Sequence, residues 1–229
     1  MNTLATTKKT KRSLLLTLIS ASLLFAISAC SQENVEQLNS RANAYYEQGD
    51  YERAIPLFKK VAALGEAPTQ FNLGVLYAKG HGVKQDYAQA RHWYEKAAAQ
   101  GLAQAQFNLG TLYQDGSGVP QDYTLARSWY EKAAAQGFAS AQLNLGTIYG
   151  DGLGVTQDYV QAKNWFEKAA AQENPTAQFN LGVLYENGQG VMKNATAAED
   201  WFLRACDNDN PDACAKLSDL GETVSDQVL

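Results

Sequence analysis

Histidine, cysteine and methionine are all scarce in this chain, whose 229 residues contain two histidines, three cysteines and two methionines. His81 and His92 stand alone, with no cysteine or further histidine beside either of them. A zinc site needs several His, Cys or carboxylate ligands gathered in one cluster. We therefore predict no metal site and no bound cofactor.

Signatures of catalysis are missing as well. A serine β-lactamase carries its nucleophile and base in a Ser-x-x-Lys tetrad, and no such tetrad occurs after residue 29. The Glu-Lys pairs of the chain are typical of solvated helix faces and not of acid/base dyads; they are Glu95-Lys96, Glu131-Lys132 and Glu167-Lys168. The sequence therefore predicts that the protein is not an enzyme and has no small-molecule substrate.

Clusters of Lys and Arg, which a nucleic-acid partner needs for phosphate neutralisation, are missing after residue 29. Before it, four basic residues between Lys8 and Arg12 precede an apolar run from Ser13 to Ile27. This run is too short for a hydrocarbon core of about 30 Å, which takes about 20 helical residues to span. The pattern predicts a signal peptide over residues 1–29. Its removal would lower the formal net charge from −5 to −9, because it carries four basic and no acidic residues.

The predicted signal peptide ends in Ile27-Ser28-Ala29-Cys30, which resembles the lipobox of bacterial lipoprotein precursors. The resemblance implies that the Cys30 thiol is lipidated and that two or more acyl chains anchor the protein stably. Ser31, not Asp, follows the cysteine, which in that family implies the outer membrane, with the protein facing the periplasm or the exterior. Residues 30–37 would form a tether. The alternative is an ordinary secretory signal followed by a chance cysteine.

The rest of the chain is organised by a repeat of 36 residues that contains no insertion. Two sets of markers recur at this spacing, the tryptophans Trp93, Trp129, Trp165 and Trp201 and the glycines Gly74, Gly110, Gly146 and Gly182, each of which follows a leucine. Apolar residues on both sides of a glycine-rich loop follow the helical period. Each unit is therefore interpreted as a helix, a loop and a second helix.

The first unit shows the expected details. We predict helices over Ala67–Ala78 and Asp86–Gln100, joined by a loop over Lys79–Lys84. The lack of a side chain at Gly74 should let the two helices pack closely, and Asp86 is well placed to cap the second helix. Trp93 and its equivalents are expected to be core side chains.

The sequence A-x-A-Q-F-N-L-G-x-L-Y-x-x-G-x-G-V-x-Q-D-Y-x-x-A-x-x-W-Y-E-K-A-A-A-Q-G at residues 103–137 resembles the Sel-1-like repeat, a relative of the tetratricopeptide repeat. The resemblance implies an all-α, right-handed superhelical solenoid of helix-turn-helix repeats, with four units over residues 67–210. Upstream, residues 44–54 look like the turn of an ordinary tetratricopeptide unit and imply a helix pair over 38–66. Residues 211–221 resemble a more polar helix that caps the solenoid, and residues 222–229 are predicted to be a disordered tail.

Cys206 and Cys214 lie at the end of one predicted helix and the start of the next. The segment from Asp207 to Pro211 breaks the helix between them, so the two helices can fold back and bring the thiols together. Exported proteins meet an oxidising compartment, and the same spacing occurs in cysteine-rich Sel-1-like proteins. A disulfide is therefore favoured, and a pair of buried free thiols is the alternative.

Candidate partner-binding residues are those outside the packing template. One set varies between units, and its members are Lys79, Asp115, Asp151 and Asn187; Arg91, Arg127, Lys163 and Glu199; and His92, Ser128, Asn164 and Asp200. A second set forms a row on the first helix of each unit, namely Phe71, Asn72, Phe107, Asn108, Leu143, Asn144, Phe179 and Asn180. Asparagines there could hold an extended peptide backbone, as in tetratricopeptide clamps. The opposing interpretation is that this row serves packing between repeats.

Three functional hypotheses follow. The first is a membrane-anchored, exported scaffold that binds a protein or peptide partner in the bacterial envelope. The second, taken from exported Sel-1-like lipoproteins that neutralise rival toxins, is an immunity protein against a periplasm-delivered toxin such as a phospholipase. The third, also taken from the resemblance, is a β-lactam-binding or weakly β-lactamase-like protein.

Overall fold

The computed structural model describes residues 35–225, and side chains as far as residue 218. The predicted signal peptide, residues 30–34 of the predicted tether with Cys30, and residues 226–229 of the predicted tail lie outside this range. Within it, every regular element is an α-helix. Helical residues 35–47 are followed by α2 (Tyr51–Ala63), α3 (Ala67–Lys79), α4 (Tyr87–Ala99), α5 (Ala103–Asp115), α6 (Tyr123–Ala135), α7 (Ala139–Asp151), α8 (Tyr159–Ala170), α9 (Pro175–Asn187), α10 (Ala195–Asp207) and α11 (Pro211–Ser225).

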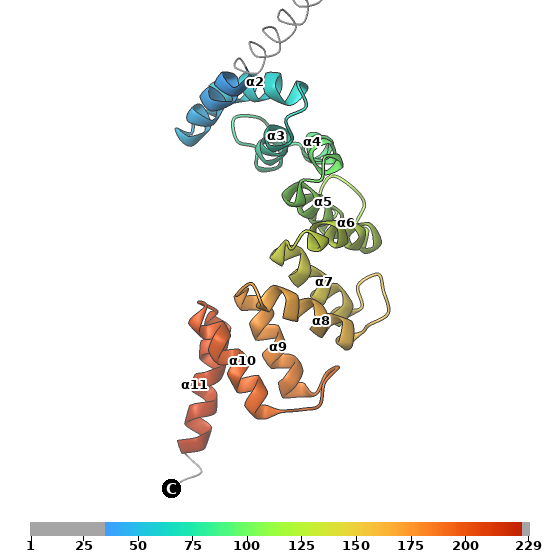
Figure 1. Ribbon diagram of the computed structural model, residues 1–229, viewed down its shortest axis with the longest axis vertical. Coiled ribbons are helices and arrows are strands. Elements are labelled where there is room, and N and C mark those ends of the chain that lie inside the picture. The colour runs from blue at the N-terminus through green and yellow to red at the C-terminus, as the bar shows by residue number, and fades with distance from the viewer. Residues whose placement is uncertain (1–34, 226–229) are drawn as a thin grey trace, which may run out of the picture.

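The helices form a solenoid. From α2 to α11, each helix packs against the next one along the chain. Figure 1 shows the helix pairs following one another along an arc, with α2 and α11 at its two ends bent to the same side. The predicted all-α solenoid of helix pairs is confirmed. We call α3, α5, α7 and α9 the A helices and α4, α6, α8 and α10 the B helices of repeats 1 to 4.

Turn chemistry fixes where the helices begin and end. Each A helix stops at a glycine in the left-handed region, such as Gly116 with φ 68°, a conformation that a residue with a Cβ resists. Each B helix begins after an Asp or Asn that caps it. The Asp86 carboxylate accepts a hydrogen bond from the Gln89 backbone N–H at 3.0 Å, so the predicted cap of α4 is confirmed.

The glycine within each A helix lies against an aromatic ring of the B helix in the same repeat. A Cβ on Gly110 would come within 2.5 Å of the Tyr130 ring, closer than carbon atoms approach. The equivalent pairs are Gly74 with Tyr94, Gly146 with Phe166 and Gly182 with Phe202. The predicted close packing at Gly74 is therefore present in all four repeats, and the partner in each is a large ring.

A second glycine in each loop joins neighbouring repeats. A Cβ on Gly118 would overlap Tyr87, the first residue of the preceding B helix. In the same way Gly154 lies against Tyr123, and Gly190 lies against Tyr159. Ala195 holds the equivalent place in α10, where no further glycine loop follows within the described residues. Each loop therefore packs on the repeat before it.

Buried glutamines also link successive repeats, a feature that the sequence analysis missed. The Gln106 side-chain amide donates to the Ala98 carbonyl at 3.3 Å, and its oxygen accepts from the Gln136 side chain at 2.8 Å. The same arrangement centres on Gln70, Gln142 and Gln178. Because buried amide groups need partners, the glutamines fix the register of each repeat on the one before.

The tryptophans are only half-buried, which corrects the expectation that they are core side chains. Trp129 packs at the edge of a cluster that contains Tyr94 and Leu109, and Lys132 lies over its outer face, 3.8 Å from the ring centroid. The fully buried rings are instead Phe58, Tyr130 and Phe202. The core of each repeat therefore lies between the ring of the B helix and the glycine of the A helix.

Both ends of the described chain are more helical than predicted. Residues 35–37, predicted to be tether, are already helical, and α11 continues to Ser225. Residues 222–225, predicted to be disordered, therefore belong to the capping helix. Helix α11 is held to the solenoid by two links: Lys216 pairs with Glu186, and a disulfide joins Cys206 to Cys214 with a Cα–Cα distance of 4.9 Å.

Reduction of this disulfide is expected to loosen α11 first. A disulfide that closes a short loop stabilises the folded state by about 2 to 3 kcal/mol in the chain-entropy model. Because solenoid repeats contact only their neighbours, the loss should stay local. Hydrogen exchange with and without reductant should show faster exchange in α11 and unchanged exchange in α4 to α6. Thiol labelling of both cysteines in the native, unreduced protein would contradict the bridge.

Candidate functional site

The variable positions form an exposed series only at the ends of the A helices. Lys79, Asp115, Asp151 and Asn187 are all exposed there. The series at Arg91 is half-buried in the first three repeats, and each of these members pairs with a glutamate one turn later. His92, Asn164 and Asp200 are exposed, whereas Ser128 is half-buried and donates to the Leu125 carbonyl at 2.8 Å.

The row of apolar residues on the A helices packs within the solenoid. Phe71 and Phe107 lie 5.8 and 5.6 Å from the rings of Tyr94 and Tyr130 in their own repeats. Phe179 lies 5.5 Å from Phe202 in the same manner, and Leu143 packs beside the core of repeats 3 and 4. All four are half-buried, so each has part of its surface available to a partner.

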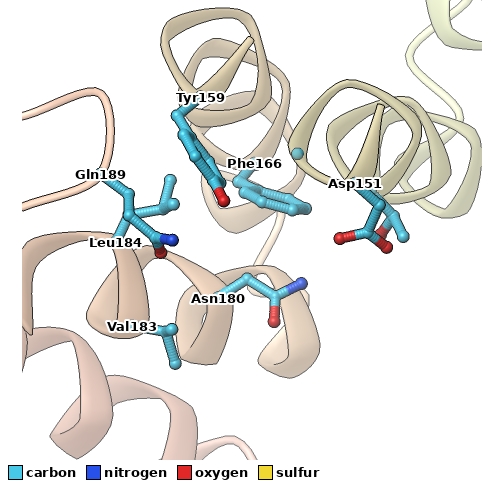
Figure 2. A pocket seen from close by; sticks show the side chains of 9 residues that line it. Asp151, Tyr159, Phe166, Asn180, Val183, Leu184 and Gln189 are labelled. Atoms are coloured by element: carbon cyan, nitrogen blue, oxygen red, sulfur yellow. The ribbon is translucent and has the colours of Figure 1, made fainter. Parts of the chain in front are cut away.

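The asparagines of the same row differ in their surroundings. Asn108 lies near the hydroxyl of Tyr94 and Asn144 near that of Tyr130, in each case on the ring of the preceding repeat. Burial raises the pKa of Tyr94 to about 12, and the nearby Asn108 amide partly opposes this rise. At the next junction the ring is Phe166, which has no hydroxyl. Asn180 instead faces a cavity (Figure 2).

This cavity lies between repeats 3 and 4 and has a volume of about 270 Å³. We call it the junction cavity. Helices α7, α8 and α9 and the following loop supply its lining, namely Thr147, Gly150, Asp151, Tyr159, Phe166, Asn180, Val183, Leu184 and Gln189. Figure 2 shows the Phe166 ring between the hydroxyl of Tyr159 and the carboxylate of Asp151, with the amide of Asn180 opposite. The cavity therefore combines an aromatic face with several polar groups.

The cavity exists because repeat 3 lacks two groups that fill the same place in repeat 2. There the Tyr130 hydroxyl donates to the Gln114 side chain at 3.1 Å and lies 3.3 Å from the Thr111 hydroxyl. Repeat 3 has Phe166 in place of the tyrosine and Gly150 in place of the glutamine. The sequence analysis missed the cavity, although these two departures from the repeat pattern were visible signals.

Among residues 35–225, no group of three or more His, Cys, Asp or Glu side chains gathers as a metal ion would require. No helix in that part of the chain has both the length and the apolar character needed to cross a membrane.

The stacked helix pairs, glycine loops and glutamine links define a helical-repeat scaffold. The Sel1 repeat family matches residues 67–102, 103–138, 139–174 and 175–210, and the tetratricopeptide repeat matches residues 35–66. The chain therefore belongs to the Sel1 repeat family, as the sequence analysis inferred from its repeat motif. No curated protein matches it.

Solved structures include similar solenoids. The structure of c5321, a protective antigen present in uropathogenic Escherichia coli strains, is 37% identical with a TM-score of 0.75. The match covers 81% of this chain but only 43% of that one. A Sel1 repeat protein from Oxalobacter formigenes is 35% identical, with a TM-score of 0.74 over 78% of this chain and 73% of that one. The immunity protein PA5088 from Pseudomonas aeruginosa, at 23% identity and a TM-score of 0.50 over 75% and 66% of the chains, shares the fold alone.

The two kinds of asparagine should respond differently to mutation. Asn108→Ala removes the amide that lies beside the Tyr94 hydroxyl, so we expect a loss of about 1 kcal/mol in stability. Asn180→Ala, at the junction cavity, should change stability by less than about 0.5 kcal/mol. Urea unfolding followed by circular dichroism measures both. Equal losses in the two variants would mean that both asparagines are structural.

Proposed function

We propose that the protein is an exported, membrane-anchored scaffold that binds a protein partner in the bacterial envelope. The Sel1 repeat is a scaffold suited to protein–protein interaction. The proposal is supported mainly by a difference between the framework of the solenoid and its exposed surface. The framework is the same in every repeat, whereas the exposed ends of the A helices change from Lys79 to Asp115, Asp151 and Asn187. A surface that varies on a constant framework is suited to recognising one particular partner.

Site-specific photocrosslinking in intact cells tests this proposal. A photoreactive side chain at position 115 should form an adduct with a defined partner. The same group at Ala135, exposed at the end of helix α6, is the matched control and should form none with that partner. Equal adducts from the two positions, or none from either, would contradict recognition by the A-helix ends.

The envelope location rests on the signal peptide and on the lipobox that ends at Cys30. Two or more acyl chains suffice for stable anchoring. Outer-membrane sorting, which Ser31 favours, belongs to the same proposal.

Cys30→Ser is expected to release the protein from the membrane without unfolding the repeats. The reason is that the acyl chains carry the proposed attachment. Cell fractionation after a salt wash measures the change. A Cys206→Ser/Cys214→Ser double variant is the control and should stay with the membranes. A Cys30→Ser variant that still pellets with membranes would contradict lipid anchoring.

Two other hypotheses are an immunity protein and a β-lactam-binding or weakly β-lactamase-like protein. Within residues 35–225, no particular residue supports either of them. The likeness to immunity protein PA5088 concerns the fold alone, so an immunity role is tested directly, by rescue of cells that express a periplasmic phospholipase toxin. The β-lactamase hypothesis is tested by nitrocefin turnover with purified protein.

A further inference from the structure

Each repeat meets the next one at a junction. The equivalent residues of the successive junctions can therefore be compared. Each junction brings together three positions. Two belong to one repeat: the ring of its B helix and a residue near the end of its A helix. The third is the residue of the asparagine row on the A helix of the next repeat. Between repeats 2 and 3 these are Tyr130, Gln114 and Asn144; between repeats 3 and 4 they are Phe166, Gly150 and Asn180; and between repeat 4 and the cap they are Phe202, Glu186 and Lys216.

The last junction shows what this place in the fold can hold. The ammonium group of Lys216 lies 2.9 and 3.0 Å from the two carboxylate oxygens of Glu186. It also lies 5.9 Å from the ring centroid of Phe202, within the range of a cation–π interaction. A phenyl face and a carboxylate therefore receive an ammonium at this junction.

The junction cavity has the same two groups without a lysine of its own. Phe166 supplies the phenyl face, and Asp151, the residue after Gly150, supplies the carboxylate. Asn180 takes the place of the lysine and faces the open space together with the Tyr159 hydroxyl (Figure 2). Asn180 and Tyr159 both offer oxygen acceptors to a donor that enters the cavity.

We propose that the junction cavity receives a lysine side chain of the protein partner. The ammonium would lie between Phe166 and the carboxylate of Asp151, as Lys216 lies between Phe202 and Glu186. The formal net charge is −5 for the whole chain and would be −9 without residues 1–29, and this negative charge favours the approach of a basic segment. The inference rests on the proposed function and adds the chemistry of one partner residue.

The other junctions do not fit this ligand. Between repeats 1 and 2, Lys79 stands at the position of Asp151 and would repel a second ammonium. Between repeats 2 and 3, Asp115 is present, but the hydrogen bond from Tyr130 to Gln114 fills the space. Asp115 is therefore a matched control for Asp151: it has the same charge and the same place in the repeat, but the Tyr130–Gln114 hydrogen bond lies beside it.

Saturation-transfer NMR on the full chain in detergent tests the inference. The probe is the peptide acetyl-Gly-Lys-Gly-amide at millimolar concentration, compared with the same peptide carrying norleucine or glutamine. We expect transfer to the lysine Hε protons and little transfer to the other two peptides. Asp151→Asn and Phe166→Tyr should each weaken lysine-peptide binding by about fivefold or more, because one removes the charge and the other adds a hydroxyl to the cavity. Asp115→Asn should leave binding unchanged.

Several results would overturn the lysine site. They are no transfer to the lysine peptide, equal transfer to the norleucine peptide, or equal losses in the Asp151→Asn and Asp115→Asn variants. Circular dichroism is the check that each variant is folded, and Phe166→Tyr reproduces a residue that repeat 2 already carries. If the peptide fails to bind while position 115 still crosslinks to its partner, the lysine site is wrong and the proposed function stands. Binding of the lysine peptide without any crosslink at position 115 supports the lysine site and contradicts contact between the partner and position 115.

Discussion

Tyr130→Ala is expected to destabilise the protein by about 3 to 5 kcal/mol, the range for a large buried aromatic side chain. The ring is fully buried in repeat 2, and it packs against Gly110 and Phe107. Its removal leaves a cavity between α5 and α6 and deprives Gln114 of its hydrogen-bond donor. Urea unfolding measures the loss of stability, and hydrogen exchange should show that α5 and α6 open first, because repeats depend on their neighbours.

Trp129→Ala is the matched comparison, one residue earlier on the same helix. Tryptophan is the larger side chain, but Trp129 is half-buried and Lys132 covers its outer face. We expect a loss of about 1 to 2 kcal/mol, because less apolar surface leaves water on folding at this position. A loss as large as that of Tyr130→Ala would show that tryptophan, not the buried ring, dominates the core.

Gly146→Ala is expected to cost about 2 to 3 kcal/mol, although alanine is the better helix former by about 1 kcal/mol. The new Cβ would overlap carbon atoms of the Phe166 ring, so the ring could not keep its place against α7. Helices α7 and α8 would have to separate, and the glutamine link from Gln142 to the preceding repeat would be strained with them. Urea unfolding of the purified variant measures the effect.

Gly150→Ala is the control, because the same change is made one turn later in the same helix. Here the added Cβ would meet only the Cβ of Ala162 at 3.5 Å, an ordinary contact. Repeat 1 already carries Ala78 at this position. We expect this variant to be stabilised by up to about 1 kcal/mol. Destabilisation of both variants would mean that glycine is needed for backbone reasons and not for the close approach of a ring.

The secondary structure could be predicted almost completely because each repeat carries its own local signals. The predicted helices of repeat 1 agree with α3 and α4 within one residue at each end, since Gly80 ends one helix and Asp86 caps the next. The Cys206–Cys214 disulfide followed from the helix break between the two cysteines. The chain termini were less well predicted, because α11 carries few such stop signals and runs to Ser225.

The candidate site was predicted less well, because a single repeat motif does not show how side chains share space. The asparagine row looked uniform in sequence, yet Asn108 lies beside the hydroxyl of a tyrosine while Asn180 lines a cavity. The difference comes from residues on other helices, where Phe166 and Gly150 replace a tyrosine and a glutamine. Arg91 was a candidate partner-binding residue but pairs with Glu95, because the two lie one turn apart on the same helix face.

The sequence alone determined the repeat length, the helix boundaries within each repeat and the family, because these depend on periodic apolar residues, glycines and caps that act locally. Only the tertiary structure decided which aromatic residue is the core. Trp129 and Tyr130 are adjacent and similar in character, and burial depends on which of them points toward Gly110. The structure also decided where the solenoid leaves a cavity. A cavity forms where the side chains of three helices together leave space unfilled, so the sequence of no single helix predicts it.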